Sequence, residues 1–112
     1  MALNMKVSYK SNADKVSADF KRAAEKALTT SALLVEGDAK LRAPVDTGNL
    51  RSSLNHKVET DRATIGTNVE YAPYVEFSTS RTPAQPFLEP ALRENKGKIQ
   101  KIFAEHIRNA TK

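Results

Sequence analysis

The side chains that most often carry out chemistry occur in this sequence without the neighbours that such chemistry needs. The two histidines, His56 and His106, have no Asp, Glu or His at a spacing typical of metal ligands. Ser52 and Ser53 lack the flanking glycines of a nucleophile elbow, and Asp46 lacks a partner carboxylate. Cysteine is absent, and the four glycines form no phosphate-binding loop. The sequence therefore predicts surface histidines and a protein that is not an enzyme, with no cofactor and no metal ion.

One stretch, APVDTGNLRSSL at residues 43–54, combines turn residues with an arginine that a turn does not need. Pro44 ends a preceding helix, the Asp46 side chain can accept backbone N–H groups, and Gly48 relieves a tight turn. Arg51 has no such backbone role. It is either a solvated charge or part of an intramolecular salt bridge, or it contacts a carboxylate on a neighbouring subunit.

Hydrophobic periodicity predicts the elements that precede this stretch. Residues 3–9 alternate in the manner of a half-buried strand. A long amphipathic helix follows the capping-box-like pair Ser11 and Asp14 and ends at Ala43. Its apolar residues recur at helical spacing: Val16, Phe20, Ala23, Ala27, Leu34, Val35 and Leu41. Gly37 costs this helix up to ~1 kcal/mol relative to alanine, so it marks a bend or a close approach by another element.

The second half of the chain alternates short apolar runs with turn residues. Leu50 and Leu54, four residues apart, predict one short helical turn. Residues 55–59 and 63–67 predict two strands of a hairpin, joined by the turn residues between them. Residues 73–79 also alternate and predict a third strand, which begins with a proline that suits a strand start or a sheet edge.

A loop and a second helix complete the chain. Residues 78–86 are rich in hydroxyl residues and proline, so we expect the most mobile internal segment there, with first proteolysis after Arg81. A C-terminal helix begins near Pro90. Residues 1–112 are predicted to form one α+β domain, a small antiparallel sheet packed against a long N-terminal amphipathic helix and a C-terminal helix. The predicted core contains Phe20, Leu34, Phe87, Leu92 and Phe103.

Eighteen Lys and Arg residues against thirteen Asp and Glu residues give a formal net charge of +5. The alternative function is therefore a small basic nucleic-acid-binding regulator. Its cationic residues would have to cluster, but here they alternate with acidic ones, and Tyr71 and Tyr74 stand among glutamates that repel phosphate. No apolar run has the length of a signal peptide or a membrane span, which predicts a protein made in the cytoplasm with no membrane partner.

Three sequence blocks together resemble a known family. They are APVDTGNLRSSL at 43–54, IGTNVEYAPYVEFST at 65–79 and PAQPFLEPALRE at 83–94. In this order and spacing they resemble the tail-completion family of long-tailed bacteriophages, small neck or head–tail connector proteins also catalogued as minor tail components. The resemblance covers roughly the C-terminal two-thirds of the chain directly, and the family also has an amphipathic helix before these blocks. Ser78 stands where the family has glycine, so the loop that follows takes another path or is mildly strained.

The resemblance implies a structural virion protein that completes the neck, where the DNA-filled head joins the tail. It implies a ring of identical subunits, with six as a candidate number, built from a subunit that can be monomeric alone. The implied partners are a head-completion protein and tail-terminator or tail-tube proteins, with DNA only as passing cargo. The implied location is the virion neck, after assembly in the cytoplasm of the bacterial host.

Charge and motif placement indicate which residues would make the subunit or partner contacts. They are Asp46, Arg51, Tyr71, Tyr74, Glu76, Arg81 and Gln85. In this interpretation the Arg51 guanidinium meets the carboxylate of Glu70 or Glu76 on the next subunit.

Overall fold

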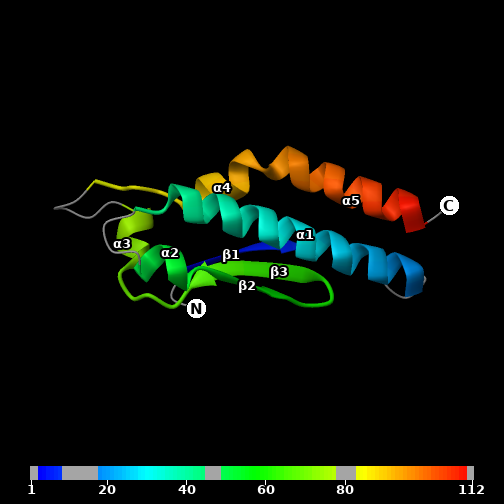
Figure 1. The fold of residues 1–112 in the computed structure, drawn as a ribbon, viewed down its shortest axis with the longest axis horizontal. Helices are drawn as coiled ribbons and strands as arrows, with labels where there is room; N and C mark the ends of the chain where they lie inside the picture. The colour runs from blue at the N-terminus through cyan, green and yellow to red at the C-terminus, as the bar shows by residue number, and fades with distance from the viewer. Residues whose placement is uncertain (1–2, 9–17, 45–48, 78–82, 111–112) are drawn as a thin grey trace.

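The computed structural model describes residues 3–8, 18–44, 49–77 and 83–110 (Figure 1). The elements in these ranges are β1 (Leu3–Ser8), α1 (Ala18–Arg42), α2 (Asn49–Ser53), β2 (Asn55–Val58), β3 (Arg62–Thr67), α3 (Ala72–Glu76), α4 (Leu88–Glu94) and α5 (Lys96–Ala110). The α+β class is confirmed, with an antiparallel sheet, a long N-terminal helix and a C-terminal helix. The predicted helix start at Ser11 and the turn at Asp46 lie outside the described residues.

The sheet has the strand order β1-β3-β2, and both outer strands are antiparallel to β3. Side chains alternate between its faces, so Val7 and Ile65 are buried. On the opposite face Lys6, Thr64 and Lys57 form a cross-strand row, because Thr64 pairs with both lysines. One face of the sheet therefore belongs to the core and the other is polar.

The predicted hairpin between β2 and β3 is confirmed. At its turn the Glu59 N–H donates to the Arg62 carbonyl oxygen at 2.7 Å. The Arg62 side chain donates two hydrogen bonds to the Asp61 carboxylate, and these bonds, aided by the guanidinium charge, lower the pKa of Asp61. Because both side chains reach solvent, this pair orders the turn more than it stabilises the fold.

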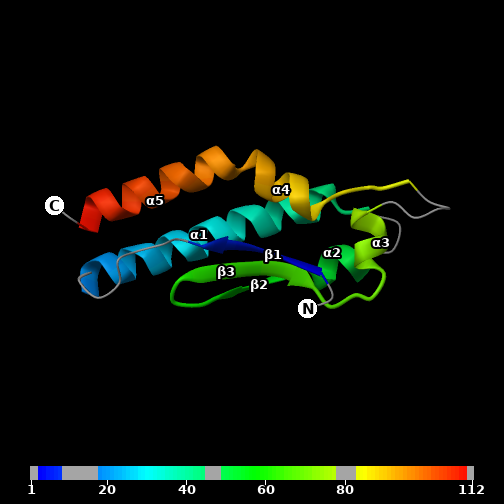
Figure 2. The same cartoon turned by 180° about the vertical axis from the view of Figure 1, so that it is seen from behind.

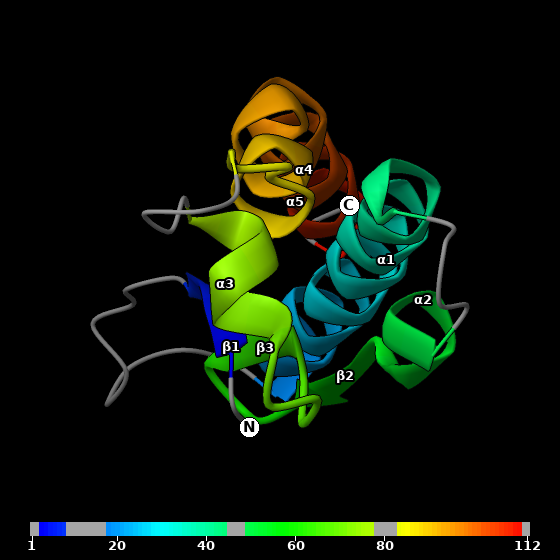
Figure 3. The ribbon, with the colours of Figure 1, turned by 90° about the vertical axis from the view of Figure 1, so that its left-hand side faces the viewer.

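The helices pack on one face of the sheet. In Figure 1, α1 lies between the sheet and the α4–α5 layer. The end-on view in Figure 3 shows α4 above β1, so the sheet, α1 and α4 enclose the core together. Figure 2, from behind, shows β1 running along β3 on that side of the molecule. The largest fully buried apolar side chains are Phe87, Leu28, Leu50, Ile65, Leu88 and Val35.

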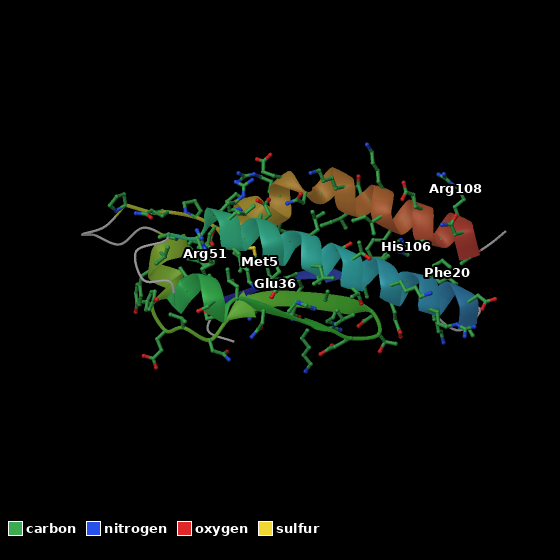
Figure 4. All side chains as sticks on the ribbon, viewed as in Figure 1. Met5, Phe20, Glu36, Arg51, His106 and Arg108 are labelled. Carbon is green, nitrogen blue, oxygen red and sulfur yellow. The ribbon has the colours of Figure 1, made fainter. Side chains whose placement is uncertain are left out.

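The predicted core is partly correct. Phe87 is fully buried, whereas the other four predicted core residues are only partly buried: Phe20, Leu34, Leu92 and Phe103. Phe20 lies near the start of α1, away from the central cluster (Figure 4). Leu41, expected on the buried stripe of α1, is 80 % exposed. That stripe is formed largely by small residues, which let α1 approach the sheet and α5 closely: Ala23, Ala24, Ala27, Ala32 and Ala39.

The strand predicted over residues 73–79 is wrong in its described part, because residues 72–76 form the helix α3. Pro73 lies in the first turn of this helix, where a missing N–H leaves no hydrogen bond unmade. An alternation only four residues long fits one turn of helix as well as a strand. The contacts of Glu76, described below, require the helix.

The predicted C-terminal helix is two helices, α4 and α5, separated at Asn95. Asn95 is buried, and its side-chain amide donates to the Asp38 carboxylate at 2.7 Å and to the Ala91 carbonyl oxygen at 2.6 Å. The break is therefore fixed by a contact with α1. Within the described residues, no helix is long and apolar enough to cross a membrane.

Candidate subunit interface

The carboxylate of Glu76 lies inside its own subunit, where the side chain is 3 % exposed. One oxygen accepts the backbone N–H groups of Phe87 at 3.3 Å and Leu88 at 2.8 Å, and the other accepts that of Glu89 at 3.3 Å. These groups begin α4 and have no partner within the helix, and the N-cap residue Phe87 cannot cap with its own side chain. A negative charge also suits a helix N-terminus. Glu76 therefore joins α3 to α4 and is not at the surface.

The segment that precedes α4 is also held by α3. The Gln85 N–H donates to the Val75 carbonyl oxygen at 2.8 Å, while the Gln85 side chain is exposed. The loop predicted to be mobile up to Phe87 is thus anchored at Gln85. Arg81, with the rest of residues 78–82, lies outside the described residues.

Ser53 on α2 and Thr67 at the end of β3 join the first two sequence blocks. Their hydroxyl oxygens lie 2.6 Å apart, and the Ser53 hydroxyl donates to the Leu50 carbonyl oxygen at 2.7 Å. Since Ser53 has only one hydroxyl proton, Thr67 is the donor between the two. Thr67 also accepts the Val69 N–H at 3.1 Å. Because Thr67 is fully buried, this series of bonds satisfies polar groups that water does not reach.

Gly66 in the second block permits the close pairing of β3 with β1. A Cβ atom at this position would clash with the Leu3 carbonyl oxygen and lie 2.8 Å from the Asn4 Cβ. The glycine is therefore required by packing between strands, with no ligand involved.

Arg51 lies where α1 ends (Figure 4). Its guanidinium donates to the Ala43 carbonyl oxygen at 3.4 Å, one of the last carbonyl groups of α1. The side chain is half-buried, and its Nε atom has no hydrogen-bond partner among the described residues. Arg51 is therefore more than a solvated charge. Asp46, the other charged residue of the first block, lies outside the described residues.

The three sequence blocks form one framework. The Ser53–Thr67 hydrogen bond connects the first block to the second, and the bonds of Glu76 connect the second to the third. These residues hold the backbone of α2, α3 and α4 at the same end of the molecule (Figure 3). Ser53, Thr67 and Glu76 therefore have structural roles in the three sequence blocks.

Two surfaces carry the large exposed apolar side chains of the described residues. The first, which we call the α3 aromatic surface, consists of Tyr71, Tyr74 and Phe77, which are 36 %, 63 % and 58 % exposed. Tyr71 and Tyr74 were predicted contact residues from the sequence. Phe77 was not among the predicted contact residues, because the alternation in the predicted strand over residues 73–79 places it on the apolar face with Val75.

The second surface, which we call the α1 groove, is formed by Leu33, Leu34, Gly37 and Leu41 opposite Lys98. It is a shallow groove of about 580 Å³, and Leu33 and Leu41 are 53 % and 80 % exposed. The sequence pattern did not indicate this groove. The exposure of Leu41 depends on which side of α1 the sheet and α5 cover. Tertiary packing determines this, and the local sequence pattern does not show it.

Both histidines make contacts within the chain. His56 Nδ1 lies 2.9 Å from the Glu36 carboxylate, so His56 joins β2 to α1 and is not a simple surface residue. His106 Nδ1 lies 2.8 Å from the Ile102 carbonyl oxygen one helical turn earlier. Among the described residues, no group of three His, Cys, Asp or Glu side chains could hold a metal ion.

Many of the cationic side chains form ion pairs within the chain. Several exposed arginines form ion pairs with carboxylates close in sequence: Arg22 with Asp19, Arg42 with Asp38, Arg62 with Asp61, and Arg93 with Glu89. Such pairs disperse positive charge rather than concentrate it on one face.

A motif framework and two exposed apolar surfaces are features of a small structural protein that assembles with other proteins. The family model described as "Bacteriophage HK97-gp10, putative tail-component" matches residues 8–77, more than half of the chain. The chain belongs to this HK97-gp10-like family of phage tail components. It is therefore a tail-associated structural protein of the virion, and family membership implies a role that is not enzymatic. No curated protein and no solved structure gives a significant match.

Proposed function

We propose that this chain completes the neck of a long-tailed bacteriophage, where a DNA-filled head joins a separately built tail. The observation that carries this proposal is its membership of a family of phage tail components. The order of its three sequence blocks, which resemble those of tail-completion proteins, supports the neck as the position. The framework built by Ser53, Thr67 and Glu76 gives those blocks a common structural purpose.

The chain acts by forming a ring of identical subunits around the path of the DNA, with six as a candidate number. A closed ring needs two different complementary surfaces on each subunit. The α3 aromatic surface and the α1 groove supply two such surfaces. A head-completion protein meets one side of the ring, and a tail-terminator or tail-tube protein meets the other.

The predicted contact residues divide by location. Tyr71, Tyr74 and Gln85 are exposed and contact the neighbouring protein directly. Arg51 and Glu76 act from inside the subunit by holding the ends of α1 and α4. Asp46 and Arg81 remain proposed contacts from the sequence.

Electron microscopy of lysates tests this function. The phage that encodes the chain would carry an early stop codon in its gene. We expect DNA-filled heads and complete tails that are not joined, and joined particles when the intact chain is supplied from a plasmid. Absent or shortened tails would contradict the neck role and indicate a role in building the tail. Joined particles, with salt-sensitive DNA binding by the purified chain, would favour the nucleic-acid-binding regulator instead.

A further inference from the structure

We infer that the α1 groove is the docking site for a second copy of this chain, which inserts its α3 aromatic surface there with Glu70 opposite Lys98. This inference rests on the proposed ring and specifies the contact between its subunits.

The α1 side of the groove has a small residue between two exposed leucines, which would let another chain approach closely. Leu33, Gly37 and Leu41 are spaced by four residues, so they lie in one row on α1. A glycine inside a helix costs about 1 kcal/mol relative to alanine. The subunit's own packing does not require it, since nothing lies within 4 Å of the place that a Gly37 Cβ would occupy. A neighbouring chain that approaches α1 at this point accounts for the glycine and for both exposed leucines.

The α3 aromatic surface has side chains of the kind that fill such a groove. Tyr74 and Phe77 are more than half exposed. Large aromatic side chains contribute strongly to an interface when a partner buries them. Hydrogen bonds of α3 hold them in place. Glu76 accepts a backbone N–H at the start of α4, and the Val75 carbonyl oxygen accepts the Gln85 N–H. A rigid aromatic surface loses little conformational freedom when it docks.

Charge favours the same pairing. Lys98 lines the groove, and Glu70 lies next to Tyr71 at the aromatic surface. Both side chains are exposed, and neither forms an ion pair within the described residues. The other charges of the groove, Asp38, Arg42 and Glu94, already have partners. The free charges on the two surfaces therefore have opposite sign.

The two surfaces are different and lie apart on the subunit, as a head-to-tail ring contact requires. The groove lies between α1 and the α4–α5 junction, whereas α3 lies on the other side of the same end (Figure 3). A contact between two different surfaces repeats from one subunit to the next and can close. A two-fold dimer could also set each aromatic surface against the partner's groove, but that contact closes at two chains and would give cross-linked dimers with no larger species.

Cysteine cross-linking tests this contact, because the natural chain contains no cysteine. The intact phage would be grown with the variant chain supplied in place of the natural one, and purified particles would be treated with a short bis-maleimide. Tyr74→Cys combined with Leu41→Cys in the same chain should give a ladder of dimers and larger species on a denaturing gel. Either variant alone should give only monomer. Phe77→Cys with Leu33→Cys is a second pair on the same surfaces, in case the first pair does not assemble.

Charge exchange gives an independent readout. Lys98→Glu should lower the yield of infectious particles at least about tenfold, and Glu70→Lys should do the same. The two changes combined in one chain should restore most of the yield, because the pair is reformed with exchanged signs. The matched control is Lys101→Glu, an exposed charge on the same helix that does not line the groove.

Two results would overturn the inference. If particles join but neither cysteine pair gives a ladder, the contact is excluded and the neck role is left intact. A dimer from Leu41→Cys alone would indicate a symmetric contact instead. The two claims can also separate in the other direction. If cross-linking gives the ladder, but heads and tails join in the phage with the stop codon, the contact is supported and the neck role is contradicted.

Discussion

The carboxylate of Glu76 accepts the backbone N–H of Leu88 at 2.8 Å, across twelve residues of sequence. This bond joins a five-residue helix to the start of a seven-residue helix, and neither is long enough to be stable by itself. The aromatic surface on α3 therefore depends on a buried charge that faces away from it.

Glu76→Ala should lower the free energy of unfolding by about 2–4 kcal/mol, since two buried N–H groups and one half-buried N–H group lose their acceptor. Glu76→Gln should lose less, because one carbonyl oxygen remains. Urea denaturation of the purified chain measures both, with exposed Glu70→Ala as the control, expected within about 0.5 kcal/mol of the natural chain. A urea midpoint for Glu76→Ala equal to that of the natural chain would contradict the capping role.

Thr67→Val should cost about 1–3 kcal/mol, although the side chains have similar shapes, because the half-buried Val69 N–H loses the fully buried Thr67 hydroxyl as its partner. Thr64→Val on the polar face of the same strand should change stability by less than about 0.5 kcal/mol. Thermal unfolding followed by circular dichroism compares the two. Equal effects at both positions would mean that the hydroxyl of Thr67 is not structurally important.

Two glycines should respond in opposite directions to alanine. Gly37→Ala should stabilise the isolated chain by about 0.4–1 kcal/mol, because its Cβ meets open space in a helix. Gly66→Ala should destabilise it by about 1–3 kcal/mol or more, because the Cβ would clash with β1. Chemical denaturation at equal protein concentration distinguishes the signs. Loss of stability in Gly37→Ala would show that the monomer needs this glycine.

Phe87→Ala should cost about 3–5 kcal/mol, because the ring is fully buried among the core residues. That loss is comparable to the whole stability of many small domains, so partial unfolding is expected. Phe20→Ala should cost less, since Phe20 is half-buried at the far end of α1. If the Phe20 variant were the less stable of the two in urea, the assignment of the core would be wrong.

Periodic patterns predicted the elements whose character is set locally. The α1 pattern, the first strand and the β2–β3 hairpin are each visible within a short window, and the structure has all three. Pro44 and the pair Leu50 and Leu54 likewise marked the end of α1 and the short helix α2. In these segments local preference and tertiary packing agree.

The misassigned segments depend on contacts between residues far apart in sequence. In α3, Glu76 bonds to the start of α4, and at the break of the last helix the Asn95 amide bonds to Asp38, 57 residues earlier. Tyr71 and Tyr74 could be selected as proposed contact residues from their motif. Leu33, Leu41 and Phe77 could not, because their exposure follows only from the packing of the rest of the chain.

The position of the chain in the virion is the most direct test of its proposed function. Intact phage particles would be labelled with a gold-conjugated antibody raised against the purified chain and examined by negative-stain electron microscopy. The proposed function predicts gold at the junction of head and tail, and none on particles that lack the chain. Label along the tail shaft or at its far tip would contradict a role in completing the neck.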